Sequence, residues 1–198
     1  MLKIELTEKE LLTIKDTDFL LTKGIVTDKL YMLFELTRTE LKKCVENSNF
    51  SFPEGTDLLD GKISKGEYYR NLPYLVLDYP AQFSSESVFA FRTMFWWGNF
   101  FSATLHLEGV ALNSYRSIIT NNLDKLLGQN IYIGVGESPW QYHYGEDNYV
   151  PLRETHVDHI NECRFLKLSK KIEIDKWNEV TGFTTNFFET ILSVLKTG

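Results

Sequence analysis

The stretch FAFRTMFWWGNFFSATLHL (Phe89–Leu107) decides the fold, because two runs of β-favouring residues flank Gly98-Asn99. Aromatic and β-branched side chains fit the pleated surface of a sheet. A Gly-Asn pair between two such runs is typical of a two-residue turn, where the backbone needs positive φ values. The stretch therefore predicts a β-hairpin.

The predicted hairpin sorts its side chains onto two faces of a sheet, because residues directly opposite each other share a face. With Gly98 and Asn99 as the loop, one face carries the pairs Trp97 and Phe100, Phe95 and Ser102, Thr93 and Thr104, and Phe91 and His106. The other face is typical of packing on helices and carries Met94, Trp96, Phe101, Ala103, Leu105, Leu107 and one charge, Arg92. A loop of three or four residues would change this partition.

Two helices and a strand are predicted before the hairpin. Apolar residues recur near helical spacing from Thr27 until Asn47-Ser48-Asn49 closes the helix, and a shorter helix over Lys9–Ile14 precedes it. Residues 51–73 contain three glycines and two prolines among charges, which favours an irregular connection. The proline-bounded run Pro73–Pro80 then predicts a strand.

Further elements are predicted after the hairpin. Ser114 is expected to cap a helix that stops at Gly128, and strands are expected over Ile131–Gly136 and Phe165–Ile174. Asp175 is expected to cap a final helix that extends to Leu195. Because this order lacks regular βαβ alternation, we predict a single α+β domain over residues 1–198. Its largely antiparallel sheet would contain the central hairpin and pack against several helices.

Charge and composition restrict the partners. Lys+Arg 21 against Asp+Glu 27 gives a net charge of -6, which provides no drive for binding nucleic-acid phosphates. No segment approaches the apolar length of a membrane span, and charges interrupt the first fifteen residues, unlike a secretory signal. Cys44 and Cys163 lie far apart, which favours free thiols. We expect a soluble, cytoplasmic protein that binds neither nucleic acid nor membrane.

The run YLVLDYP (Tyr74–Pro80), followed by the hairpin stretch and Glu108-Gly109, resembles a bacterial family of conserved single-domain proteins of similar length and unknown function. The resemblance covers the middle third of the chain. It implies an α+β fold and a bacterial, cytoplasmic protein. It transfers no activity, cofactor or site residue.

The segment Glu154–His159 concentrates side chains that bind metals. His156 and His159 are three residues apart and would share one face of a helix, with Cys163 one turn further along. A metal-dependent hydrolase would also need a third ligand, His143 or His106, and a base, Glu154 or Asp158. The HExxH pattern is absent, and a solvated polar loop whose histidines titrate near neutral pH explains the same residues.

The loop Trp140–Tyr149 is a candidate ligand site. Its rings alternate with amide, imidazole and carboxylate groups, a combination that can hold an amphipathic small molecule. A long loop that folds its rings back onto the domain explains the same composition. Placed against the mixed polar and aromatic face of the hairpin, the loop predicts a site in which Trp97 and Trp140 stack on the ligand and His106 and His143 form hydrogen bonds with it. Arg92 would supply a counter-charge to an acidic ligand if the register of the hairpin lets it reach this face.

Other sequence patterns give weaker evidence of function. Gly134-Val135-Gly136 lacks the third glycine of a dinucleotide-binding loop, and no P-loop, GxSxG or CxxC motif occurs. Asp78 and Arg92 could form an ion pair or bind a charged ligand. We favour a structural ion pair, since an arginine on a core-facing position needs a partner. Asp78, Glu86 and Glu108 could serve acid–base chemistry if two of them were close, but their spacing does not bring them together.

Three functions remain open. We favour the binding of a small molecule in an aromatic and polar pocket. Metal-dependent hydrolysis by the His/Glu/Asp cluster is the enzyme alternative. The third is a homodimeric or partner-binding module, which follows if a hairpin face containing Phe91, Phe95, Trp97 and Phe100 is uncovered. The sequence identifies no cofactor and does not decide whether the protein is an enzyme.

Overall fold

The structure is a computed structural model that describes residues 3–196. Contacts between α-carbons divide the chain into two units, one ending at Leu33 and one beginning at Phe34. No helix within residues 3–196 combines the length and the apolar character needed to cross a bilayer.

The first unit is helical. Helix α1 (Glu8–Lys15) begins with a capping box in which the side chains of Thr7 and Glu10 each accept a hydrogen bond from the other residue's backbone N–H. The chain leaves the helical conformation at Asp16, whose carboxylate accepts a hydrogen bond from Phe19 N at 2.9 Å. This bond caps α2 (Thr17–Asn47), which therefore begins ten residues before the predicted start at Thr27.

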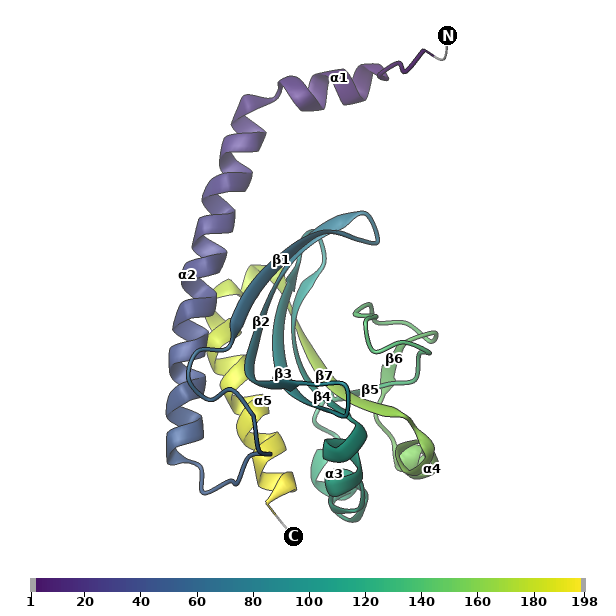
Figure 1. Cartoon of the computed structure of the whole chain (residues 1–198). Coiled ribbons are helices and arrows are strands. Elements are labelled where there is room, and N and C mark those ends of the chain that lie inside the picture. The colour runs from purple at the N-terminus through teal and green to yellow at the C-terminus, as the bar shows by residue number, and fades with distance from the viewer. Residues whose placement is uncertain (1–2, 197–198) are drawn as a thin grey trace. The chain divides into compact units, whose positions relative to one another are not determined.

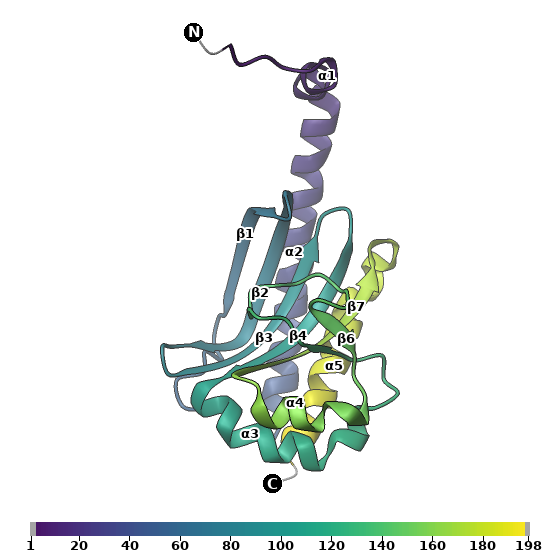
Figure 2. The same cartoon turned by 90° about the vertical axis from the view of Figure 1, so that its right-hand side faces the viewer.

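The second unit is built on one antiparallel sheet of seven strands in the order β1-β2-β3-β4-β7-β5-β6. The α+β class is thus confirmed, with helices packed on an antiparallel sheet (Figures 1 and 2). The strands are β1 (Lys62–Tyr69), β2 (Leu72–Phe83), β3 (Ser87–Trp96), β4 (Phe100–Glu108), β5 (Tyr132–Gly134), β6 (Tyr149–Pro151) and β7 (Phe165–Glu173). The remaining helical segments are α3 (Gly109–Asn121), η1 (Leu123–Leu126), η2 (Glu154–His156), α4 (Val157–Glu162), η3 (Ile174–Glu179) and α5 (Val180–Leu195).

One face of this sheet, called here the helix face, packs against helices and forms the hydrophobic core with them. Figure 1 shows α5, in yellow, running along this side of the strands. The ring of Phe91 lies 4.8 Å from that of Phe188 in α5, and the ring of Phe101 lies 5.5 Å from that of Trp177 in η3. Burial of each such side chain contributes about 1.5–3 kcal/mol to folding. The helix face therefore holds the second unit together.

The opposite face, called here the polar face, is covered by the chain between β5 and β6. It carries Asp78, Arg92, Thr104, His106, Lys167 and Ser169. Tyr142, from the covering segment, reaches Arg92, and Tyr144 reaches Ser169. The polar face thus combines these buried polar side chains with a smaller apolar cluster of Val76, Met94, Trp96 and Phe100.

The register of the β3–β4 hairpin differs from the predicted one. Trp96, not Trp97, pairs with Phe100, so the loop has three residues, Trp97–Asn99. Only Gly98 in this loop has a positive φ, 71°, whereas the commonest two-residue turn needs two such residues. The shift by one residue moves Arg92 onto the face of His106 and moves Phe91 onto the helix face.

The hairpin therefore exposes no apolar patch. Phe91, Phe95 and Phe100 are all buried, the first two on the helix face and Phe100 against Tyr144 on the polar face. Of the four residues named for an uncovered hairpin face, only Trp97 is partly exposed, so the condition stated above for a dimer through this face is not met.

Two further boundaries differ from prediction. Strand β1 lies within residues 51–73, where an irregular connection was predicted. No residue of β1 is fully buried, so its sequence, KISKGEYY, can be polar. Helix α3 begins at Gly109 rather than after Ser114, whose hydroxyl donates to Val110 O inside the helix at 3.0 Å. Gly109 permits this early start because its φ is +61°.

Substitution of Gly109 by alanine is expected to destabilise the second unit. A Cβ atom at this position would lie 2.0 Å from Glu86 O, a backbone atom that cannot move alone. Gly128 is the matched control, since its φ is +72° but a Cβ there has nothing within 4 Å. We expect Gly109→Ala to lower the free energy of unfolding by about 1–3 kcal/mol more than Gly128→Ala does in urea titrations. Equal losses would show that positive φ alone accounts for the effect.

Candidate functional site

An ion pair lies at the centre of the polar face. Arg92 donates from Nε to one Asp78 oxygen at 2.7 Å and from a terminal nitrogen to the other at 2.8 Å. This bidentate geometry confirms the ion pair predicted from the sequence. Burial alone would lower the pKa of Arg92, but the hydrogen bonds and charge of Asp78 outweigh it and raise that pKa. Arg92 therefore stays charged.

Arg92 also fixes the segment that covers the polar face. Its remaining terminal nitrogen donates to the hydroxyl of Tyr142 at 2.6 Å, and its guanidinium carbon lies 5.7 Å from the ring centroid of Trp140. Cation–π contacts of this kind stabilise a ring in one place. The ion pair on the sheet thus determines where Trp140 lies.

Lys167, from β7, fixes the same segment from a second strand. Its ammonium donates to the backbone oxygens of Pro139 at 2.8 Å and Gln141 at 2.6 Å, and it lies 4.9 Å from the centroid of Tyr142. Among the described residues it forms no ion pair with a carboxylate. Burial, and then the charge of Arg92, lower the pKa of Lys167 well below its ordinary value.

His106, from β4, is a buried imidazole with an unsatisfied nitrogen. Its Nε2 has no hydrogen-bond partner within residues 3–196, and the nearest carboxylate oxygen, from Glu108, is 3.6 Å away. Burial, and then the positive charges of Lys167 and Arg92, lower the pKa of His106 to about 3, so the ring is neutral at pH 7. The ring meets that of Trp140 edge to face at 6.0 Å.

A small cavity of about 10 Å³ adjoins His106, and its lining includes Arg92, Thr104, Tyr142 and Lys167. This volume is about that of a single water molecule, and polar groups surround it. The cavity therefore suits a small polar group and not a whole organic ligand.

A much larger groove opens beside this cavity. Its volume is about 1190 Å³, and Arg92 and Pro139 line both spaces. Trp140 borders the groove with 52% of its surface exposed. The charged residues that line the groove are Asp57, Lys62, Asp78, Glu86, Arg92, Glu108, Glu137 and Arg164. Carboxylates outnumber cations among them.

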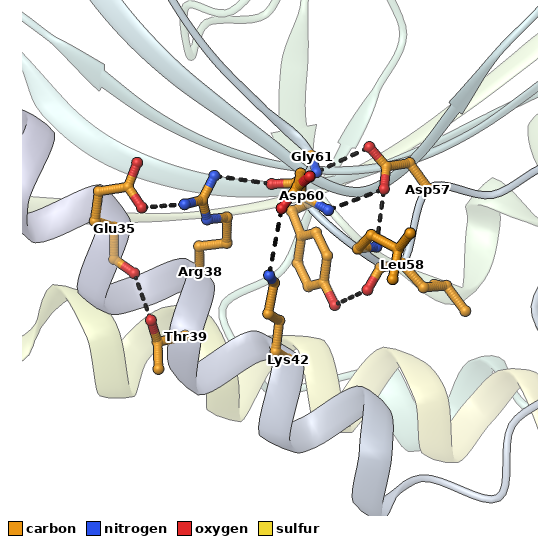
Figure 3. Close-up of polar contacts among 10 residues, drawn as sticks. Glu35, Arg38, Thr39, Lys42, Asp57, Leu58, Asp60 and Gly61 are labelled. Carbon is orange, nitrogen blue, oxygen red and sulfur yellow. Dashed lines mark hydrogen bonds and ion pairs between the residues drawn. The ribbon is translucent and has the colours of Figure 1, made fainter.

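The turn Asp57–Gly61 forms one wall of this groove and is rigidly held. Asp57 accepts hydrogen bonds from three backbone N–H groups of the turn at 2.8–3.0 Å. Figure 3 shows that Arg38 and Lys42 of α2 reach the same turn, at Asp60 O and at the Asp60 carboxylate. Contacts within the turn and with α2 therefore fix this wall of the groove.

Three of the five predicted ligand residues meet at this site. Arg92, His106 and Trp140 lie together as described. Trp97 lies elsewhere, in the hairpin loop, where its ring packs 5.4 Å from that of Phe95. His143 is on the covering segment but bonds with Tyr69, Arg70 and Asp147. The register shift explains the loss of Trp97.

The convergence of histidines that a metal site requires is not found. Within residues 3–196 no group of three or more His, Cys, Asp or Glu side chains could hold a metal ion. His156 Nδ1 accepts a hydrogen bond from Arg153 N at 3.0 Å, and His159 Nε2 lies 3.0 Å from Gly134 O. Among the described residues, Glu154, Asp158 and Cys163 therefore belong to no such group.

Lys167 and Glu137 belong to the site but were not predicted from the sequence, and Tyr142 was predicted only as part of the candidate loop Trp140–Tyr149. Lys167 alternates with Leu166 and Leu168, a pattern that predicts a solvent-exposed side chain, yet the covering segment buries it. The sequence offers one indirect signal of this burial. A long aromatic loop, Trp140–Tyr149, is predicted close to the strand that carries Lys167.

Comparisons with protein-family models, curated proteins and solved structures found no match to this chain.

Proposed function

We propose that the second unit binds a small polar molecule with a flat ring in the groove beside Trp140. The observation that carries the proposal is the half-exposed Trp140, which the sheet holds at the border of a groove of about 1190 Å³. Ligand sites are commonly concave and largely preformed, with few orienting polar groups. An indole held in place offers a flat surface at little entropic cost.

The charges of the groove favour a neutral or positively charged ligand. Arg92 is already neutralised by Asp78, so in this proposal it positions Trp140 instead of pairing with an acidic ligand. Glu86 and Glu137 form no ion pair among the described residues and border the same groove. A ring that carries an amine would stack on Trp140 and bring its charge to these carboxylates.

The test is a thermal unfolding screen with nucleosides, sugars, aromatic amines and divalent metals. A ligand at about one hundred times its dissociation constant stabilises a protein by about 2.7 kcal/mol, which raises the melting temperature of such a domain by several degrees. The proposal expects a response to a ring-containing compound. A response to metals alone would favour the hydrolase alternative, and no response to any ring compound would contradict the proposal.

Replacement of Trp140 by alanine is expected to weaken binding of any compound found in this screen at least tenfold, because the stacking surface is lost. A tenfold loss corresponds to about 1.4 kcal/mol, and tryptophans at binding sites often contribute more. Tyr68→Ala is the matched control, since Tyr68 is an exposed ring that does not border the groove. Titration calorimetry would measure both. Equal affinities for Trp140→Ala and the unsubstituted protein would place the ligand elsewhere.

A further inference from the structure

His106 carries a buried nitrogen that no described residue satisfies. Its side chain is only 7% exposed, and within residues 3–196 its Nε2 has no hydrogen-bond partner. An unpaired polar atom in a protein interior is costly, so such atoms usually bond to a water molecule or a ligand. His106 also lines the cavity of about 10 Å³. A polar atom placed in this cavity would therefore complete the hydrogen bonding of the polar face.

The cavity and the large groove are two parts of one site. The residues that line both spaces are Phe83, Arg92 and Pro139. Glu108, whose carboxylate lies 3.6 Å from His106 Nε2, also borders the groove. The imidazole and the indole of Trp140 are nearly perpendicular, with centroids 6.0 Å apart. A flat ring that stacks on Trp140 therefore has one edge beside the cavity.

The cavity offers donors to an incoming group. Among the described residues, its charged lining consists of Arg92 and Lys167, without a carboxylate. Three of the five N–H groups of Arg92 donate to Asp78 and Tyr142, which leaves two N–H groups for a guest. The hydroxyl of Thr104 is already bonded to Ser169 at 2.7 Å. The cavity therefore favours an oxygen that accepts hydrogen bonds over an amine.

Nε2 of His106 is itself a donor. Because the pKa of His106 is about 3, the ring is neutral at pH 7 and only one of its nitrogens carries a hydrogen. At 3.6 Å the carboxylate of Glu108 is too far from Nε2 to accept a hydrogen bond, but its negative charge favours the hydrogen on that nitrogen. An oxygen in the cavity would accept this hydrogen.

We propose that the cavity receives a carbonyl oxygen of the ligand, whose flat ring stacks on Trp140, and that His106 Nε2 donates a hydrogen bond to this oxygen. The inference rests on the proposed function and names the class of its ligand, a planar ring with an exocyclic carbonyl group. The cavity has about the volume of one water molecule, so it accepts a single oxygen and excludes a carboxylate.

Pairs of ring compounds that differ in one carbonyl oxygen test this inference. The pairs are inosine and purine riboside, oxindole and indole, and 2-pyridone and pyridine. Titration calorimetry should give the carbonyl member of each pair that binds an affinity about tenfold higher, because its partner leaves the buried donor unpaired. Equal affinities would overturn the inference and leave the proposed function standing, since a water molecule would then keep the cavity. No binding by any of the compounds would contradict both.

The variant His106→Phe removes Nε2 and keeps an aromatic ring. We expect it to weaken binding of the carbonyl member about tenfold and to leave the affinity of its partner unchanged. Trp140→Ala should instead weaken both members alike. His156→Phe is the matched control, since His156 lines neither space, and it should bind like the unsubstituted protein. An equal loss for both members in His106→Phe would overturn the inference, because the histidine would then act through packing alone.

NMR of the unsubstituted protein gives a second measurement that needs no variant. The ¹⁵N resonance of His106 Nε2 should shift when the carbonyl member binds and change little with its partner, because only the carbonyl accepts the hydrogen bond. The same shift with both members would overturn the inference.

Discussion

Replacement of Asp78 by asparagine is expected to destabilise the second unit by about 3–5 kcal/mol. The side chains of Asp78 and Arg92 are only 9% and 15% exposed, so the variant would leave a buried guanidinium without a counter-charge. Asparagine keeps the shape of the side chain but offers one acceptor oxygen where Arg92 now donates to two. Urea titration of the purified variant would measure the loss.

Two variants show whether the loss comes from the unpaired charge. Combining Asp78→Asn with Arg92→Met removes both charges, and we expect it to cost less than Asp78→Asn alone. Glu40→Gln breaks the exposed pair with Lys43, and we expect it to cost less than about 1 kcal/mol. If Asp78→Asn cost no more than Glu40→Gln, the pair would contribute little and could not hold the covering segment in place.

The sequence predicts the fold class better than the register of its strands. Alternation over Phe165–Ile174 and the proline-bounded run before the hairpin reflect burial on one or both faces, which is local information. The hairpin register instead depends on whether Trp97 belongs to the loop. Both loop lengths leave aromatic residues on both faces, so the sequence pattern alone does not decide between them.

The candidate site depends on contacts that no local pattern contains. The ion pair between Asp78 and Arg92 was predictable because a charge among apolar strand residues needs a partner. Burial of Lys167 was not, because it depends on Pro139 and Gln141, more than twenty residues away, folding over the strand. The alternation of a strand predicts the burial of its apolar face, whereas Lys167 is buried by backbone oxygens and by the rings of Tyr142 and Tyr149.

Acidification from pH 7 to pH 4 is expected to destabilise the second unit through His106. Burial, and then the charges of Lys167 and Arg92, lower its pKa to about 3, against about 6.5 in an unfolded chain. Between these two values the unfolded chain binds more protons, so stability rises with pH. The stability that depends on a neutral His106 is fully present above about pH 6.5. The free energy of unfolding then decreases as the pH falls from 6.5 toward 3. Its full size is on the order of 5 kcal/mol, at 1.36 kcal/mol per pKa unit.

The variant His106→Gln isolates this contribution, because glutamine cannot take up the proton. Carboxylates such as Asp57 also titrate on acidification, so the measured quantity is the difference between the two proteins at each pH. We expect the free energy of unfolding of the unsubstituted protein to fall more steeply than that of His106→Gln between pH 6.5 and 4. His156→Gln is the control, since His156 is only partly buried. Glu108 lies 3.6 Å from Nε2 and would partly compensate a protonated ring, so Glu108→Gln should steepen the dependence. Parallel curves for the unsubstituted protein and His106→Gln would mean that water or Glu108 reaches the ring, and that the polar face is not closed around it.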